Sequence, residues 1–149
     1  MRRLAFTVLL LSVASAYGAA KDETAAELKA RLESARPEER PELCIQIARR
    51  QLRNADKLYS EGKVDQARDA VDDIVTYSEK ARDAATQTKK HLKNVEIDVR
   101  KMAEKLRDIK RTLVLEDQAP VEQAIRRLED VRTTLLKEMF AKENKKEKK

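Results

Sequence analysis

The sequence contains few of the residues that end helices or form turns. Among its 149 residues, two are glycine, three are proline and 3% are aromatic. Folds built on β-sheets need many chain reversals, and these are made largely from Gly, Pro and short polar residues. The shortage of such residues therefore excludes all-β and α/β folds. In a chain of this length it predicts a single all-α domain.

Residues that carry chemistry are equally scarce, with one His and one Cys in the whole chain. Catalysis needs several convergent groups with tuned pKa values, and a zinc site needs several His or Cys ligands. His91 lies among lysines, which is typical of a solvated side chain. The carboxylates of Asp65, Asp69, Asp72 and Asp73 form a row that is usually a solvated helix face. We therefore expect no enzyme, no metal site and no cofactor.

The first twenty residues are typical of a secretory signal peptide. Arg2 and Arg3 precede an apolar run at residues 4–13, and small residues follow at 14–20. The apolar run is about ten residues long, whereas a membrane-spanning helix needs about 20. We predict that residues 1–20 are removed, with cleavage after Gly18 or Ala20. The mature protein would then have no stable membrane span and would be periplasmic or extracellular.

Export places the single cysteine, Cys44, in an oxidising compartment. One cysteine cannot form an intramolecular disulfide, so the fold has no covalent cross-link. Two alternatives remain for Cys44. It is either a small buried apolar residue or one half of an intermolecular disulfide.

Charged residues make up 40% of the chain, with a formal net charge of +6. Without Arg2 and Arg3 the chain has 31 basic and 27 acidic residues, a net charge of +4. Residues 142–149 contribute +3 of this, and we expect them to form a disordered Lys-rich tail with at most weak contact to anionic surfaces. Because the excess charge lies in this tail and aromatic residues are rare, nucleic acid is not an expected partner.

Apolar residues recur at helical spacing in four segments. Three of them are predicted helices at about 24–35, 41–61 and 119–141, the first of which opens with the T-x-x-E capping box of Thr24 and Glu27. Pro37 and Pro41 separate the first helix from the second. Together these segments predict an elongated antiparallel bundle or coiled coil inside one domain, residues 21–141.

The fourth segment has the most regular spacing and predicts one long central helix at about 63–115. No Gly or Pro lies between Gly62, which is assigned to a hairpin turn, and Pro120. Steps of three and four residues connect its apolar positions, the pattern of a coiled-coil seam. The candidate seam is Val64, Val71, Ile74, Leu92, Val95, Val99, Met102, Leu106, Ile109 and Leu113. If the neighbouring helices cover this seam the monomer is complete, and if they cover it partly the seam would pair with a second copy.

The charges of the long segment differ between its two halves. Residues 61–83 have a net charge of −3 and residues 89–111 a net charge of +5. Short connections make neighbouring helices antiparallel. We therefore expect the bases of the second helix, among them Arg49, to lie against the acidic half, and residues 116–138 to lie against the basic half.

The segment from Ala55 to Ile74 resembles the core of a tetratricopeptide-repeat hairpin. The resemblance lies in Ala55, the large residues Leu58 and Tyr59, Gly62 at the turn, and Ala67 on the following helix. It occurs in one copy and implies a role in protein interaction without assigning ligand residues. We therefore expect an exported, non-enzymatic protein that acts through contacts with other proteins or with itself, as an adapter or a self-associating scaffold. The alternative is a small periplasmic chaperone for envelope proteins.

Overall fold

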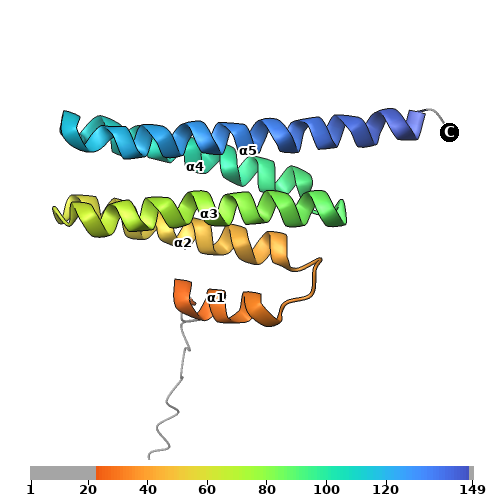
Figure 1. Cartoon of the computed structure of the whole chain (residues 1–149), viewed down its shortest axis with the longest axis horizontal. Coiled ribbons are helices and arrows are strands. Elements are labelled where there is room, and N and C mark those ends of the chain that lie inside the picture. The colour runs from red at the N-terminus through yellow and green to blue at the C-terminus, as the bar shows by residue number, and fades with distance from the viewer. Residues whose placement is uncertain (1–22, 148–149) are drawn as a thin grey trace, which may run out of the picture.

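A computed structural model describes residues 23–147 of the chain (Figure 1). Within this part the chain is all-α, which confirms the predicted helical bundle, and its helices are α1 (Ala25–Ser34), α2 (Arg40–Ser60), α3 (Val64–Thr88), α4 (Leu92–Thr112) and α5 (Leu115–Glu147). The predicted signal peptide and both predicted cleavage sites lie outside the described residues.

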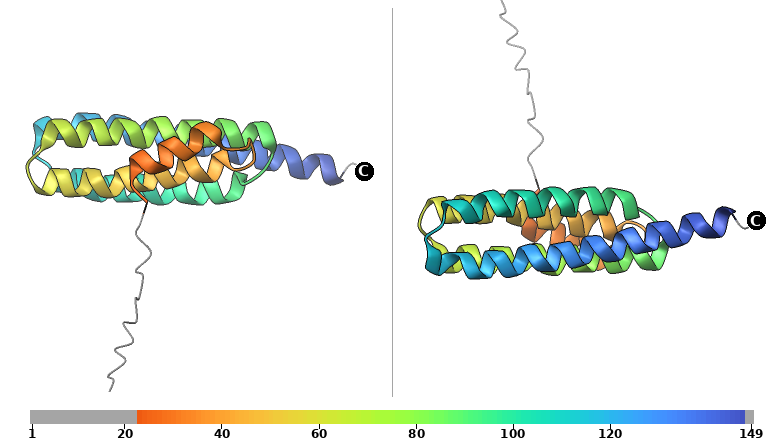
Figure 2. Two further views of the ribbon diagram at one scale, coloured as in Figure 1. Left: turned by 90° about the horizontal axis from the view of Figure 1, so that it is seen from below. Right: turned by 90° about the horizontal axis from the view of Figure 1, so that it is seen from above.

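The molecule consists of two antiparallel hairpins, α2–α3 and α4–α5, stacked into a rod of four helices. Figures 1 and 2 show that α3 lies along α5 and α2 along α4, and that both of these pairs run parallel. The connection between α3 and α4 therefore passes diagonally across one end of the rod. Helix α1 lies outside the rod against α2.

Helix α1 begins with the predicted capping box. The Thr24 hydroxyl accepts a hydrogen bond from the Glu27 amide at 3.2 Å, and the Thr24 amide donates to the Glu27 carboxylate at 3.0 Å. These two bonds satisfy amides that have no partner within the helix. Leu28, Leu43 and Ile47 form a small apolar cluster that holds α1 against α2.

The prediction of one continuous helix at residues 63–115 is wrong. The chain breaks at residues 89–91, where Lys89 and His91 adopt left-handed backbone conformations with φ of 56° and 62°. Each such residue costs about 1–2 kcal/mol when it is not glycine. The break turns α4 back along the rod, where its apolar stripe is buried between α2 and α5. Burial of large apolar side chains at about 1.5–3 kcal/mol each outweighs the cost of the two strained residues.

Helix α5 is longer at both ends than its predicted span of 119–141. It begins at Leu115, with Pro120 inside the helix one turn from the start. Its ring keeps φ in the helical range, but Pro120 lies five residues after the start of α5 and has no amide to donate to the carbonyl four residues back. At the other end the helix continues to Glu147, so residues 142–147, predicted to be a disordered tail, are helical.

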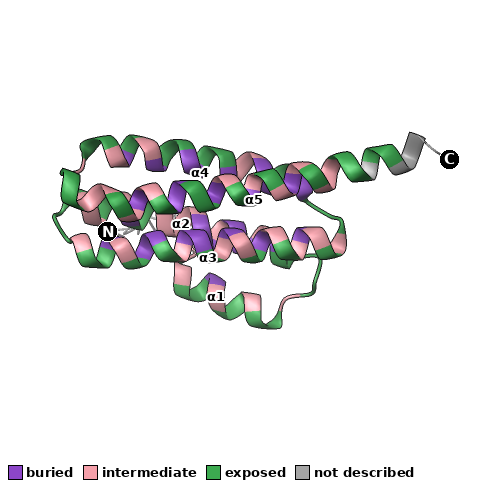
Figure 3. Cartoon of the chain, turned by 45° about the horizontal axis from the view of Figure 1, so that its top comes forward, coloured by how far each residue is buried: buried purple, intermediate pink, exposed green. Residues whose placement is uncertain are grey.

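The core of the rod is continuous along all four long helices. Figure 3 shows buried residues where the helices face one another and exposed residues along the outer faces. Six of the buried apolar residues of α2 and α3 are alanine, against two of those described in α4 and α5, where Leu, Val, Ile and Met predominate.

Ion pairs follow the predicted charge pattern in one hairpin and depart from it in the other. Helices α4 and α5 are joined as expected by Lys110–Glu122 at 2.5 Å and Arg107–Glu129 at 2.7 Å. Arg49, however, was expected against the acidic α3 but lies 3.6 Å from Asp98 of α4. The difference follows from the diagonal crossing, because this crossing places α4 beside α2.

Candidate interaction surface

The candidate seam lies inside the rod and presents little surface. Val64 and Leu113, at its two ends, are partly buried. The other eight residues are buried: Val71, Ile74, Leu92, Val95, Val99, Met102, Leu106 and Ile109. Helices of the same chain therefore cover the seam, and a second copy could reach it only if the hairpins separated.

The predicted hairpin turn is present at Gly62. Its φ of 74° lies in the left-handed region that favours glycine. The turn is closed by a hydrogen bond from the Lys63 amide to the Leu58 carbonyl at 2.9 Å. Ala55 and Ala67, on the helices either side, are fully buried. The turn itself is exposed and polar, so its residues act in chain reversal and offer no apolar contact.

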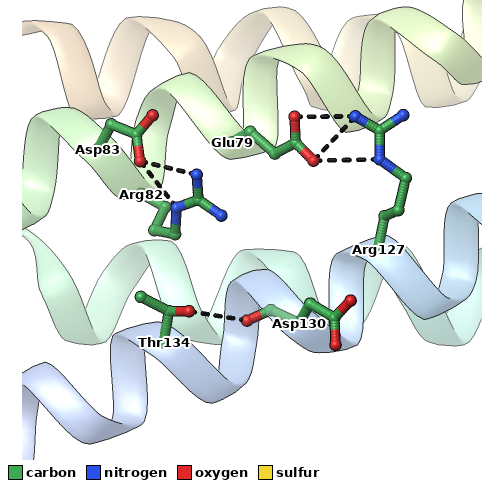
Figure 4. Close-up of polar contacts among 6 residues, drawn as sticks. All are labelled: Glu79, Arg82, Asp83, Arg127, Asp130 and Thr134. Carbon is green, nitrogen blue, oxygen red and sulfur yellow. Dashed lines mark hydrogen bonds and ion pairs between the residues drawn. The ribbon is translucent and has the colours of Figure 1, made fainter.

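Polar side chains along the α3–α5 face pair with one another (Figure 4). Arg127 of α5 binds the Glu79 carboxylate of α3 through both Nε and Nη2, at 3.1 and 2.9 Å. The Arg82 guanidinium contacts Asp83 at 2.8 Å, and the Thr134 hydroxyl donates to the Asp130 carbonyl at 3.1 Å. The pair of Arg127 with Glu79 joins the parallel helices α3 and α5, whereas each of the other two contacts lies within one helix.

The structure also accounts for other titratable residues that could have formed a site. Lys29 binds Asp73 at 2.7 Å, and this hydrogen bond raises the pKa of Lys29. Cys44 is 2% exposed, and burial raises the pKa of its thiol to about 11, so the structure places it among the buried core residues. Within residues 23–147 no three His, Cys, Asp or Glu side chains are grouped to hold a metal ion.

Large exposed apolar side chains occur at the two ends of the rod. At one end, Val114 and Leu115 are 63% and 79% exposed in the α4–α5 turn. At the other end, Phe140 is 61% exposed on α5, just beyond the ion pair of Lys89 with Glu138 at 2.5 Å. Among the described residues, the large exposed apolar side chains therefore lie at the two ends of the rod.

The two ends also differ in charge. We call residues 61–66 and 113–118 the acidic tip, because they contain four acidic residues and one basic residue, a net charge of −3. Residues 89–93 and 137–141 form the basic end, with four basic residues and one acidic residue, a net charge of +3. Arg68, just outside these ranges on α3, pairs with Asp117 at 2.9 Å and with Asp65 at 3.7 Å, so it offsets part of the negative charge of the tip.

The basic end is stepped, because α5 extends past the α3–α4 connection (Figures 1 and 2). After Met139, which lies against the hollow beside His91 and Leu92, α5 continues for eight residues to Glu147. At 1.5 Å per residue this is about 12 Å of helix that projects beyond the bundle. Phe140 is the first residue of this projecting segment.

No family model, curated protein or solved structure matched this chain. In the part of the chain that the structure describes, none of the helices has a stretch long and apolar enough to cross a bilayer.

The three large exposed apolar residues at the two ends, Val114, Leu115 and Phe140, were not among the candidates derived from the sequence. The sequence nevertheless contains a feature that marks each end. Leu113, Val114 and Leu115 are three consecutive apolar residues at a predicted helix end, and Phe140 is one of only two phenylalanines. Their exposure depends on where the chain turns, and this was not evident from the helical periodicity.

Proposed function

We propose that this protein is exported through a cleavable signal peptide and acts through protein–protein contacts, without catalysing a reaction. The observation that carries the proposal is the distribution of apolar surface: the core is closed within one chain, and the large exposed apolar side chains lie at the two ends. Exposed apolar residues bordered by charges are typical of contact sites between proteins. The paired polar side chains of Figure 4 are consistent with a structural role for the long faces.

Site-specific photo-cross-linking in the producing cell tests this proposal. A photoreactive residue would replace Leu115 or Phe140, with exposed Thr76 in the middle of α3 as the matched control position. We expect discrete protein adducts from the two end positions and none from position 76. Equal labelling from all three positions, or no protein adducts from the ends, would refute contact through the ends.

The same experiment separates the proposal from the chaperone alternative. A small periplasmic chaperone would give a broad range of adducts with unfolded envelope proteins. One or a few discrete adducts would favour an adapter or scaffold.

A separate experiment tests whether the protein is exported and where it is cleaved. Amino-terminal sequencing of the mature protein should begin at Ala19 or Lys21, the residues that follow the two predicted cleavage sites. An unprocessed protein retained in the cytoplasm would contradict this part of the proposal.

A further inference from the structure

We propose that the partner of the acidic tip is the basic end of a second copy of this chain, so that the rods associate head to tail. This inference rests on the proposed function and names the partner of the same surface. Its first support is that each end carries exposed apolar side chains: Val114 and Leu115 at the tip, and Phe140 at the basic end. Contact between unlike ends removes all three from water in a single interface.

Charge selects this arrangement over a symmetric one. Two basic ends have the same net charge of +3, and two acidic tips have the same net charge of −3, so contact between like ends is repulsive. A tip against a basic end brings opposite net charges together. Electrostatic complementarity of this kind chooses the partner and the orientation more than it adds affinity.

Shape supports the same pairing. The helix segment after Met139 projects beyond the bundle and leaves a step beside the α3–α4 connection. The hollow at this step is lined by the apolar residues Leu92 and Met139 and by more basic than acidic side chains, the remaining residues being Lys89, His91, Lys93, Asn94 and Glu143. An apolar turn with acidic neighbours, such as Val114–Leu115 followed by Glu116, has the chemistry that this hollow accepts.

Two unlike surfaces on one chain form a heterologous interface, which leaves one free surface of each kind in every complex. The rods would therefore add one after another instead of stopping at a dimer. Because the apolar patches are small, the association is weak and depends on concentration. It also weakens at high salt, because the opposing charges are exposed.

Two variants and their mixture test this arrangement. Leu115→Lys damages the tip, and Phe140→Asp damages the basic end. Each replaces an exposed apolar side chain with a charge that repels the opposite end. The matched controls are Gln123→Lys and Thr133→Asp, at exposed positions in the middle of α5. Circular dichroism of all four variants verifies that they fold.

Sedimentation velocity over a concentration series gives the readout. We expect the mass of the unsubstituted chain to rise with concentration and fall with added salt, and the two control variants to behave alike. Each end variant should dissociate about tenfold more readily or worse, since an apolar contact is lost and a repulsion is added. An equal mixture of the two end variants should recover association, because the intact tip of Phe140→Asp meets the intact basic end of Leu115→Lys.

Other results would overturn the inference. If Phe140→Asp abolishes association, Leu115→Lys has no effect and the mixture recovers nothing, the copies pair through like ends. If the chain stays monomeric and binds vesicles of phosphatidylglycerol with phosphatidylcholine, but not phosphatidylcholine alone, the basic end contacts a lipid surface. If the chain stays monomeric while position 140 cross-links to a different protein in the cell, the inference fails and the proposed function stands.

Discussion

The two hairpins of the rod bury side chains of different sizes. In α2–α3 six of the buried residues are alanine, and they lie beside larger residues such as Ile45, Ile74 and Val75: Ala48, Ala55, Ala67, Ala70, Ala81 and Ala85. Among the described residues of α4–α5 two buried residues are alanine, Ala103 and Ala124, and most of the others are large, such as Val99, Met102, Leu106, Leu128 and Leu135. The polar links differ too, because α2 and α3 share the hydrogen bond from Gln51 to Asp73 at 2.6 Å, whereas α4 and α5 are joined by ion pairs such as Arg132–Glu96 at 2.6 Å.

From this difference we predict how each hairpin responds when a buried side chain is enlarged or truncated. A close contact through alanines has no room for a larger side chain, so the first hairpin should be sensitive to enlargement. A contact filled by large side chains leaves a cavity when one is truncated, so the second hairpin should be sensitive to removal.

Leu106→Asp should have the largest effect and should act on the second hairpin. Leu106 is fully buried, and an unpaired carboxylate there costs several kcal/mol of the free energy of unfolding. We expect loss of helicity in α4 and α5, measured by circular dichroism and by hydrogen exchange resolved along the chain. Lys101→Asp, at an exposed position on the same helix, is the control. An unchanged melting curve for Leu106→Asp would contradict the placement of this residue in the core.

Leu128→Ala should leave a cavity in the second hairpin. The side chain is fully buried, and such truncations cost about 2–5 kcal/mol. Urea unfolding gives the change in stability, with Leu115→Ala in dilute solution as the control, because Leu115 is 79% exposed. If Leu128→Ala and Leu115→Ala changed the free energy of unfolding equally, Leu128 could not be a buried residue on which the second hairpin depends.

Ala55→Leu should overfill the first hairpin. Ala55 is fully buried, and adding methylene groups to a well-packed site costs about 1–3 kcal/mol. The same substitution at exposed Ala119 should be close to neutral in urea unfolding. A stabilised Ala55→Leu variant would mean that the alanine contact has spare volume.

Cys44 should make the stability of the chain depend on alkaline pH. Burial raises the pKa of the folded thiol to about 11 from its ordinary value of 9.0, so the folded state holds this proton more tightly than the unfolded state. The contribution is complete below pH 9 and is lost as pH rises toward 11, by up to about 3 kcal/mol. Urea unfolding between these pH values should show a smaller loss in Cys44→Ala than in the unsubstituted chain. Parallel curves would contradict the burial of the thiol.

Exchanging residues at the two left-handed turns should have the smallest effects, with opposite signs. Gly62→Ala should destabilise the first hairpin by about 1 kcal/mol, because an L side chain is strained at a φ of 74° even though nothing lies within 4 Å of the new Cβ. His91→Gly should relieve similar strain between α3 and α4 and stabilise the chain by up to about 1 kcal/mol. Thermal melting should show a lower melting temperature for Gly62→Ala and a higher one for His91→Gly. A higher melting temperature for Gly62→Ala would contradict the turn geometry.

Much of the fold could be predicted because it depends on local patterns. The capping box of Thr24, the turn at Gly62 and the inward stripes of every long helix follow from residue type and spacing. The break at residues 89–91 could not be predicted in this way. Thr88 and Leu92 are four residues apart, so the apolar spacing stays in phase across the break and the periodicity contains no trace of it.

The ends of the rod were harder to predict than its core. A helical pattern identifies which face is buried, but the exposure of Val114, Leu115 and Phe140 depends on which helices reach that level of the rod. The candidate seam was chosen for its regularity, and regular apolar spacing is what a buried stripe requires. The residues best placed for contact with a partner are those where that spacing ends.

The sequence by itself determined that the described chain is helical, which residues face inward, and that α2 pairs with α3 and α5 with α4, because propensity, periodicity and short connections act over a few residues. Only the tertiary structure decided that the longest apolar pattern is divided between two helices, that α2 lies beside α4, and that apolar side chains remain exposed at two oppositely charged ends. The physical reason is that burying α4 on two sides stabilises the chain by more than the two left-handed residues cost. That comparison involves contacts between distant segments, which no local pattern contains.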